Sequence, residues 1–272
     1  MQLLGCESPA RPDCVAVSLD FAVSQVQRLA VQPQQIQAQA VHLTATQQHY
    51  LQRVLRLSAG DRLVVMDGQG HSWWAVLSEQ PDQLTGLTAI AATDHPAAPL
   101  PAITLVAALP KGNAFDEVVR QVTELGVQQI VPVISDRTLL QPSPKKVDRW
   151  RRIATEAAEQ SERLTIPDIA DPVALTQFWS TPDDLISAPT QTSYICTARR
   201  SAPHLLRALS SSDPPGDAIT LLVGPEGGWT EREVEQAIAR GSQPVSLGHL
   251  VLRAVTAAVA AVAIAASSRE LL

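Results

Sequence analysis

The chain has 272 residues, of which 45% are hydrophobic and 18% are charged. This composition excludes a wholly disordered chain, because disorder requires low hydrophobicity and high net charge. The net charge of −6 at pH 7 argues against a protein that coats nucleic acid without selectivity, although it leaves room for a local basic face. The length fits one large domain or two smaller ones.

The three cysteines, Cys6, Cys14 and Cys196, are widely spaced and form no CxxC motif. We therefore expect neither a disulfide framework nor a metal site, and we expect a reducing, cytoplasmic environment. The run Leu3-Leu-Gly-Cys6 resembles a lipoprotein cleavage box, but too few residues precede it for a signal peptide. The apolar stretch 255–266 is shorter than the roughly 20 residues of a membrane span, so a buried helix is expected there.

The amino-terminal part begins with residues 1–24, which show no clear pattern and are expected to be a leader. No acidic residue lies between Phe21 and Gly60, whereas three arginines do. This segment is either a polar surface or a weakly basic face for RNA. On the second interpretation the contacts to the RNA backbone come from Arg28, Arg53 and Arg56.

Residues 25–95 are predicted to form a small β-barrel. Thr44-Ala-Thr-Gln47 resembles a capping box and predicts a short helix that runs to Leu55. The turn residues Asp67–Gly70 lie between two strand-like segments and predict a hairpin. The predicted strands span 62–67, 71–77 and 84–92. The proline-rich segment 94–101 is the expected domain boundary.

From 101 to 272 strand-like and helix-like segments alternate, which predicts a mostly parallel sheet with helices on both faces. The expected strands span 103–108, 127–134, 193–197 and 218–223. One helix is expected to open at Asn113 and to end at Gly126. Another is expected over 145–162, and a third is expected from the capping box Thr230–Glu233 to Gly241.

The strongest chemical signal is Leu221–Trp229, which reads LLVGPEGGW. A buried strand leads there into a glycine-rich turn, at the end of the sheet where α/β proteins bind ligands. The glycines alone also suit a tight strand-to-helix connection, but Glu226 in so confined a loop favours a binding role. The absence of a Walker lysine and of GxGxxG argues against a nucleoside triphosphate or a dinucleotide.

Two weaker signals follow. Arg253 comes after the Ser246-Leu-Gly248 turn and directly precedes the alanine-rich helix, so it is either an exposed charge or an anchored functional guanidinium. Basic residues outnumber acidic ones between Arg137 and Arg163. The helix expected over 145–162 carries most of these charges. Its charged face is either solvated or a second surface for phosphates, with Arg149 and Arg152 as candidates.

Taken in order, these segments resemble a known family. The motifs are LPKG at 109–112, TELGV at 123–127, IVPV at 130–133, EAAEQSER at 156–163, VGPEGGW at 223–229 and SLG…LR at 246–253, preceded by His49–Arg56 and the pairs Gly60-Asp61 and Asp67-Gly68. The succession resembles the RsmE family, bacterial ribosomal RNA uridine N3-methyltransferases of the SPOUT superfamily. The resemblance covers about residues 27–267.

The resemblance implies a PUA-like β-barrel over 25–95 and an α/β SPOUT domain with a carboxyl-terminal trefoil knot over 101–272. It also implies a homodimer that uses S-adenosylmethionine to methylate N3 of one uridine in 16S ribosomal RNA or the small ribosomal subunit. Arg253 and Glu226 are the candidate catalytic residues. The methyl donor is expected against Val223, Gly224, Glu226, Gly227, Leu247, Gly248 and Leu252.

The chain departs from the family pattern at four positions. Leu250 stands where an arginine is usual, Val255 where a glutamate is usual, Gln121 where a lysine is common and Tyr50 where a second histidine is common. Valine cannot accept a proton, so an essential base at 255 is excluded and Glu226 is the nearest alternative. Two other functions stay open: a non-catalytic RNA-binding module, and a SPOUT enzyme for transfer RNA or another ribosomal RNA position.

The alanine-rich helix bears on the oligomeric state. Small and branched apolar residues occupy nearly its whole girth from Ala254 to Ala266. Such a helix must be covered on all sides, either within one subunit or by a second copy of the chain. The family resemblance favours the second copy.

Overall fold

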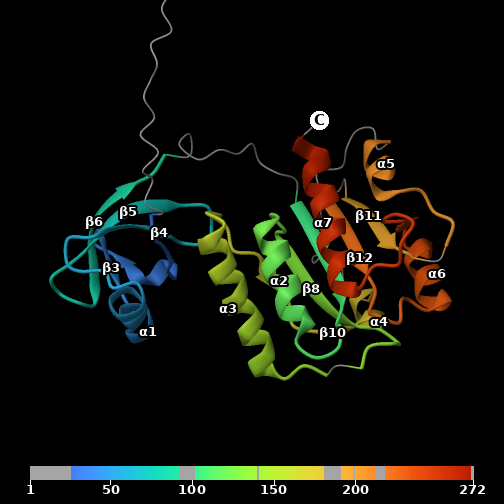
Figure 1. Cartoon of the computed structure of the whole chain (residues 1–272), viewed down its shortest axis with the longest axis horizontal. Helices are drawn as coiled ribbons and strands as arrows, with labels where there is room; N and C mark the ends of the chain where they lie inside the picture. The colour runs from blue at the N-terminus through green and yellow to red at the C-terminus, as the bar shows by residue number, and fades with distance from the viewer. Residues whose placement is uncertain are drawn as a thin grey trace, which may run out of the picture.

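The computed structural model describes residues 26–91, 102–139, 141–180, 191–198, 200–211 and 218–270. It shows two parts side by side, the N-terminal β-domain (residues 26–91) and the C-terminal α/β domain (from residue 102) (Figure 1). The expected leader 1–24 and the expected boundary 94–101 lie outside the described residues.

The N-terminal β-domain is a six-stranded sheet with the strand order β1-β4-β5-β6-β3-β2. Its strands are β1 (Arg28–Ala30), β2 (Ile36–Gln37), β3 (Ala40–His42), β4 (Arg62–Met66), β5 (Ser72–Leu77) and β6 (Gln83–Ala89). Strand β1 runs parallel to β4 at the edge of the sheet, whereas β4, β5 and β6 run antiparallel to one another. Fully buried leucines such as Leu51, Leu63 and Leu84 fill the core.

The predicted hairpin is confirmed. The Asp67 carboxylate accepts hydrogen bonds from the amides of Gln69 (2.7 Å) and His71 (3.1 Å), so it shapes the turn between β4 and β5. The Thr44 hydroxyl accepts from the Gln47 amide and opens α1 (Ala45–His49) as predicted. This helix is shorter than expected, because a π-helical turn at Tyr50–Val54 replaces its second half.

The C-terminal α/β domain contains a seven-stranded parallel sheet. Six strands lie in the order β10-β8-β7-β12-β11-β13, and β9 pairs with β8. The strands are β7 (Ala102–Ala108), β8 (Gln129–Ile134), β9 (Asp168–Ile169), β10 (Val173–Ala174), β11 (Gln191–Cys196), β12 (Ala218–Val223) and β13 (Gln243–Val245). The helices are α2 (Ala114–Glu124), α3 (Pro144–Gln160), α4 (Leu175–Phe178), α5 (Leu205–Ser210), α6 (Glu231–Ala239) and α7 (Ala254–Glu270).

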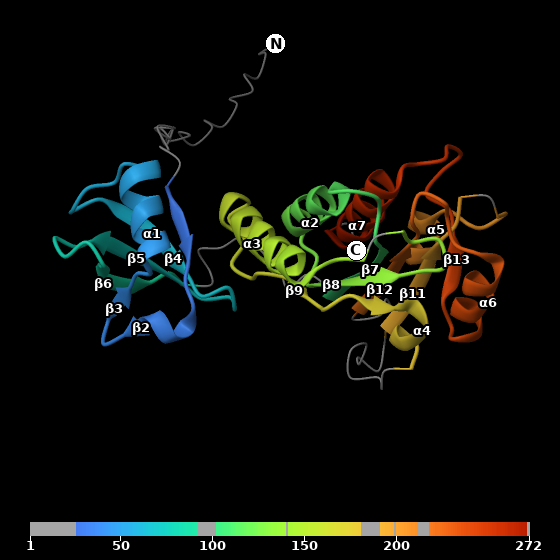
Figure 2. The same ribbon diagram turned by 90° about the horizontal axis from the view of Figure 1, so that it is seen from below.

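Helices cover both faces of this sheet, as predicted. Helices α2 and α7 lie on one side and α4 on the other (Figure 2). Each face has its own core: Phe115 and Trp150 are buried in the first and Phe178 and Val234 in the second. Strand β12 sends alternate residues into the two cores, Leu221 into the first and Leu222 into the second, which explains its unbroken apolar sequence.

The predicted helix ends are mostly confirmed. Gly126 and Gly241 follow α2 and α6 with φ of 89° and 88°, and the Thr230 hydroxyl accepts from the Glu233 amide. Asn113 occupies the N-cap position of α2, but its side chain does not bond to the helix. The side-chain oxygen of Asn113 accepts instead from Lys146 Nζ at 3.2 Å, because α3 lies across this end of α2. Among the described residues, no helix has the length and apolar character that a bilayer crossing requires.

Candidate functional site

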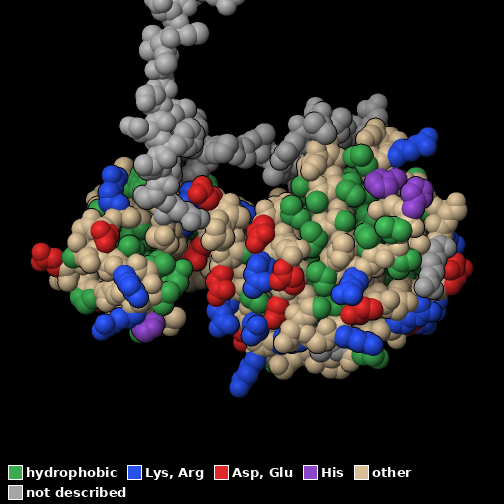
Figure 3. Space-filling view, in the orientation of Figure 1, with side chains coloured by type: hydrophobic (Ala, Val, Ile, Leu, Met, Phe, Trp, Pro, Cys, Tyr) green, Lys and Arg blue, Asp and Glu red, His purple; other side chains and the backbone are tan. Residues whose placement is uncertain are grey.

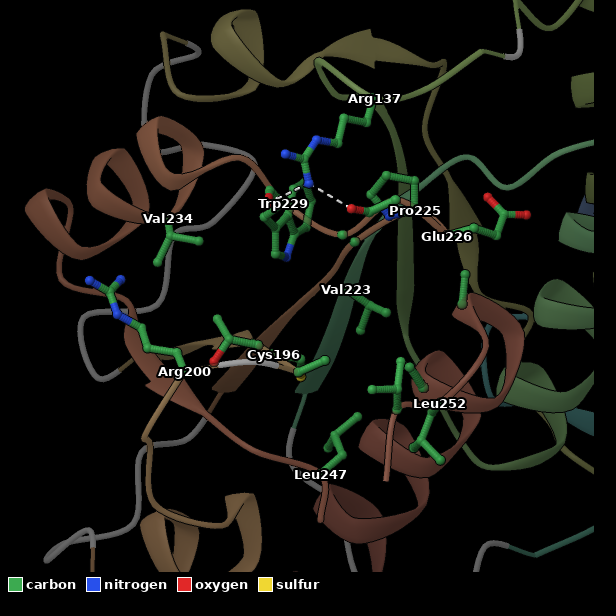
Figure 4. Close-up of a pocket in the computed structure, with 18 of the residues that line it drawn as sticks. Arg137, Cys196, Arg200, Val223, Pro225, Glu226, Trp229, Val234, Leu247 and Leu252 are labelled. Carbon is green, nitrogen blue, oxygen red and sulfur yellow. Dashed lines mark hydrogen bonds between the residues drawn. The ribbon is translucent and has the colours of Figure 1, made fainter. Parts of the chain in front are cut away.

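A cavity of about 290 Å³ opens at the carboxyl ends of β11 and β12 (Figure 4). One wall is the glycine-rich loop, residues 224–229, which connects β12 to α6. The opposite wall is the leucine loop, residues 247–252, which leads from β13 into α7. The sheet therefore places two loops that are distant in sequence around one cavity, where parallel sheets bind ligands.

Glycine is favoured in the first wall because other groups approach its backbone closely. A Cβ atom on Gly224 would lie 3.3 Å from the ring and the amide nitrogen of Trp229. A Cβ atom on Gly227 would lie 3.2 Å from Cδ of Arg137. These contacts leave the bare backbone of the loop as a lining of the cavity.

Neighbouring strand ends hold the glycine-rich loop in place. Arg137, after β8, donates from Nη1 to the carbonyls of Gly227 (2.7 Å) and Trp229 (3.4 Å), as the dashed lines in Figure 4 show. The Lys111 amide, after β7, donates to Glu226 Oε1 at 3.0 Å. The loop is thus fixed from two sides before any ligand binds.

The leucine loop is held mainly by its own residues. The Ser246 hydroxyl donates to the Gly248 carbonyl at 2.9 Å and accepts from the Gly248 amide at 3.1 Å. Beyond this turn, Leu250 and Val251 line the cavity, yet they are 80% and 65% exposed. This wall is therefore apolar and open to solvent in the single chain.

The floor of the cavity is apolar and contains Cys196 and Val223. Burial raises the pKa of the Cys196 thiol to about 12. The thiol therefore stays protonated at neutral pH and serves as a small hydrophobic group rather than as a nucleophile. At the mouth, Arg200 pairs with Glu231 at 2.9 Å, so charges of both signs border the cavity.

The structure brings together all seven residues that were predicted to hold the methyl donor. Each of them lines this cavity: Val223, Gly224, Glu226, Gly227, Leu247, Gly248 and Leu252. Arg253 follows directly but is exposed and does not line the cavity itself. Arg137, Cys196 and Thr197 also line the cavity, although the sequence did not single them out. The strand-end rule that identified Glu226 applies equally to the ends of β8 and β11.

The five arginines predicted to contact RNA lie in different surroundings. Arg53 and Arg56 are exposed, and no ion pair reaches them within the described part of the chain. The other three have acidic partners. Arg28 pairs with Glu162 at 2.8 Å, Arg149 with Asp116 at 2.8 Å and Arg152 with Glu156 at 3.6 Å.

Comparisons with known proteins agree with this architecture. A family model described as an RNA methyltransferase domain matches residues 96–266, and one described as an RNA methyltransferase PUA domain matches residues 43–87. Ribosomal RNA small subunit methyltransferase E of Synechocystis is 46% identical over 236 residues, which is 87% of this chain and 76% of the relative. The chain belongs to the RsmE family. The Bacillus subtilis RsmE protein is 28% identical, over 88% of this chain and 94% of its own length.

Solved structures of RsmE and related methyltransferases share the whole arrangement. RsmE from Neisseria gonorrhoeae, crystallised with S-adenosyl methionine, is 31% identical with a TM-score of 0.75, over 88% of this chain and 95% of that chain. A putative methyltransferase from Legionella pneumophila with bound SAM is 25% identical with a TM-score of 0.74, over 89% and 98% of the two chains. The predicted family and the α/β fold with a PUA-like amino-terminal domain are confirmed.

Proposed function

We propose that this chain transfers a methyl group from S-adenosylmethionine to N3 of one uridine in 16S ribosomal RNA, free or within the small ribosomal subunit. The observation that carries the proposal is the convergence of the seven predicted donor-site residues on one cavity. Membership of the RsmE family and the two SAM-bound relatives support the same activity.

The cavity suits S-adenosylmethionine in its size and in the chemistry of its lining. Its volume of about 290 Å³ is close to the lower limit of small-molecule pockets, about 300 Å³. The apolar side chains of Val223, Leu247 and Leu252 suit an adenine ring and a thioether chain. A Cβ atom on Gly224 or Gly227 would make a tight contact with Trp229 or Arg137, so glycine suits both positions and leaves bare backbone for the donor. The charged groups at the mouth suit its amino-acid end.

Bound S-adenosylmethionine supplies an electrophilic methyl group. A residue of the chain must then accept the proton on uracil N3, because N3 is a poor nucleophile until that proton leaves. Glu226 Oε1 is held by the Lys111 amide, and within the described residues no hydrogen bond reaches Oε2. We assign the role of proton acceptor to this second oxygen of Glu226.

Arg253 is the candidate for holding the negative charge of the uracil or of a neighbouring phosphate. It is exposed beside the cavity-lining Leu252, and its planar guanidinium can donate several hydrogen bonds to an anion. Val255 is half-buried in the first turn of α7 and cannot take a proton, so the reaction cannot depend on an acid at that position.

We further propose that the chain acts as a cytoplasmic homodimer whose second copy covers the leucine loop. Apolar side chains gather on the surface around α7 (Figure 3). Leu250 and Val251, at the edge of the cavity, are the most exposed of them in this region. The trefoil knot implied by the resemblance accounts for the meeting of the glycine-rich and leucine loops. We propose this knot for the chain, and we propose the domain limits 25–95 and 101–272.

Two measurements test the proposal. Calorimetric titration with S-adenosylmethionine is expected to give saturable heat, whereas a non-catalytic RNA-binding module gives none. Mass spectrometry of 16S ribosomal RNA from a deletion strain is expected to show loss of 3-methyluridine. Unchanged 3-methyluridine would contradict the assignment, and a loss of methyluridine from transfer RNA instead would favour the alternative substrate.

A further inference from the structure

The N-terminal β-domain is tied to the C-terminal α/β domain along the end of α3. Strand β1 is an edge strand, so the Ala30 amide faces away from β4 and needs another partner. The amide donates to Glu159 Oε1 of α3 at 2.7 Å. Burial raises the pKa of the Glu159 carboxyl, and Glu156 raises it further, although the bond from Ala30 lowers it.

An ion pair adds a second tie between the same elements. Arg28 Nη2 lies 2.8 Å from Glu162 Oε2, and the Arg28 side chain is only 15% exposed. Glu162 directly follows the C-cap residue of α3 and has a φ of 60°, a conformation in which glycine is the favoured residue. The chain thus accepts backbone strain at a position whose side chain reaches the other domain.

A third tie is formed by main-chain contacts. The Gly70 amide donates to the Leu164 carbonyl at 3.2 Å, and the Ile166 amide donates to the Gly68 carbonyl at 3.0 Å. Gly68 has a φ of 70°, and a Cβ atom there would lie 2.7 Å from Cδ1 of Ile166, so both the backbone conformation and the close approach favour glycine. The turn of the β4–β5 hairpin therefore adds a short strand pairing to the junction (Figures 1 and 2).

We propose that Arg28, Glu159 and Glu162 are positioning residues that hold the N-terminal β-domain in one orientation, so that ribosomal RNA gripped by it presents its uridine to the cavity. The inference rests on the proposed function. Methyl transfer requires the reacting atoms to be aligned closely, and a small displacement far from the chemistry lowers the rate strongly. On this account Arg28 is occupied by Glu162 rather than by an RNA phosphate.

Glu162→Gly separates these two roles of Arg28. The substitution relieves the backbone strain but removes the ion-pair partner of the mostly buried Arg28. These effects oppose each other, so the thermal midpoint is expected to change little. If Arg28 binds phosphate, releasing it from Glu162 strengthens RNA binding and increases its salt dependence. If the pair positions the domain, kcat/KM for ribosomal RNA falls by about tenfold, whereas the Kd for S-adenosylmethionine is unchanged.

Hydrogen exchange measures the stability of the contact between the two domains directly, without RNA. In Glu162→Gly the amides of Ala30, Gly70 and Ile166 are expected to exchange roughly three- to fivefold faster. Glu235→Gln is the matched control, because it removes the same charge from an exposed site on α6 and leaves both readouts unchanged. Glu159→Gln keeps an acceptor for the Ala30 amide, so it is expected to change neither readout much. Glu159→Ala removes the acceptor and is expected to speed exchange and lower kcat/KM as Glu162→Gly does.

The outcomes are distinguishable. Faster exchange together with reduced kcat/KM for ribosomal RNA supports the positioning role. Unchanged exchange in both Glu162→Gly and Glu159→Ala overturns it, as does stronger RNA binding with undiminished turnover. A wild-type chain that fails to methylate 16S ribosomal RNA contradicts the proposed function instead, while the exchange data still decide whether the three side chains hold the junction.

Discussion

The two walls of the cavity are built on different principles. The glycine-rich loop is braced by Arg137 and by the Lys111 amide, so its shape is set before the donor binds. The leucine loop has one internal serine turn and then exposes Leu250 and Val251. The first wall is preorganised by the fold of one chain, which favours affinity for the donor. The second is left apolar and open, as expected of a surface that a second copy completes.

The largest expected effect concerns Arg253, beside the open wall. Arg253→Ala is expected to lower the single-turnover methylation rate roughly a hundred- to thousandfold, because removing one charge-stabilising contact costs about 2.7–4 kcal/mol in the transition state. Affinity for S-adenosylmethionine should hardly change. A mutant that loses donor binding but keeps its rate at saturating donor would show that this assignment is wrong.

Val255→Glu is the companion to that test. It restores the acid that is usual in the family at this position. A large gain in rate would mean that the chain is a weakened enzyme, whereas an unchanged rate agrees with Glu226 as the proton acceptor. Glu226→Gln in the same assay is then expected to lower the rate and to leave the donor Kd within a few-fold.

Changes in the glycine-rich loop are expected to lower the affinity for S-adenosylmethionine. Gly224→Val puts a branched side chain against the ring and amide of Trp229. Overpacking of this kind costs about 1–3 kcal/mol of folding stability. The loop is expected to shift to relieve it, so S-adenosylmethionine binding measured by calorimetry is expected to weaken. Gly241→Asn is the control, because asparagine tolerates the left-handed conformation at this helix end, outside the cavity. Unchanged affinity in Gly224→Val would show that the donor does not touch this loop.

Arg137→Ala tests the brace itself. It removes the hydrogen bonds to the carbonyls of Gly227 and Trp229 without placing anything in the cavity. Charged hydrogen bonds of this kind contribute about 1.5–3 kcal/mol to stability. Without them the loop is less preorganised, so donor affinity is expected to fall. Arg232→Ala is the matched control, since Arg232 pairs with Asp136 rather than with the loop. Equal losses in the two variants would argue against a specific brace.

The smallest effect on the single chain is expected at Leu250. Because this side chain is 80% exposed, Leu250→Asp should change the free energy of unfolding of the isolated subunit by no more than about 0.5 kcal/mol. Light scattering at micromolar concentration is expected to show a dimer for the wild type and a monomer for the variant. A monomeric wild type would contradict the proposal that a second copy covers the leucine loop.

The sequence predicted what depends on local patterns. The buried strand before Gly224, the capping box at Thr230 and the turn at Asp67 are each encoded within a few residues. It could not predict which strand ends lie side by side. Arg137 was therefore overlooked, although it contacts the loop that contains Glu226. Nor could it show that Arg28 meets Glu162, far along the chain. In the sequence alone Arg28 stands in a segment without acids, and the acid that pairs with it becomes visible only in the fold.

The position of β12 in the sheet has a consequence for biosynthesis. Strand β7 pairs with β12 from Ala102 to Ala107, yet β7 begins at residue 102 and β12 at residue 218. At ribosomal elongation rates the gap between them lasts on the order of ten seconds. During that interval one side of β7 has no strand to pair with, and such an edge can recruit strands from other nascent chains. The cavity that β12 completes is thus among the last parts of the protein to form, and crowded synthesis or slowed elongation is expected to favour aggregation over assembly.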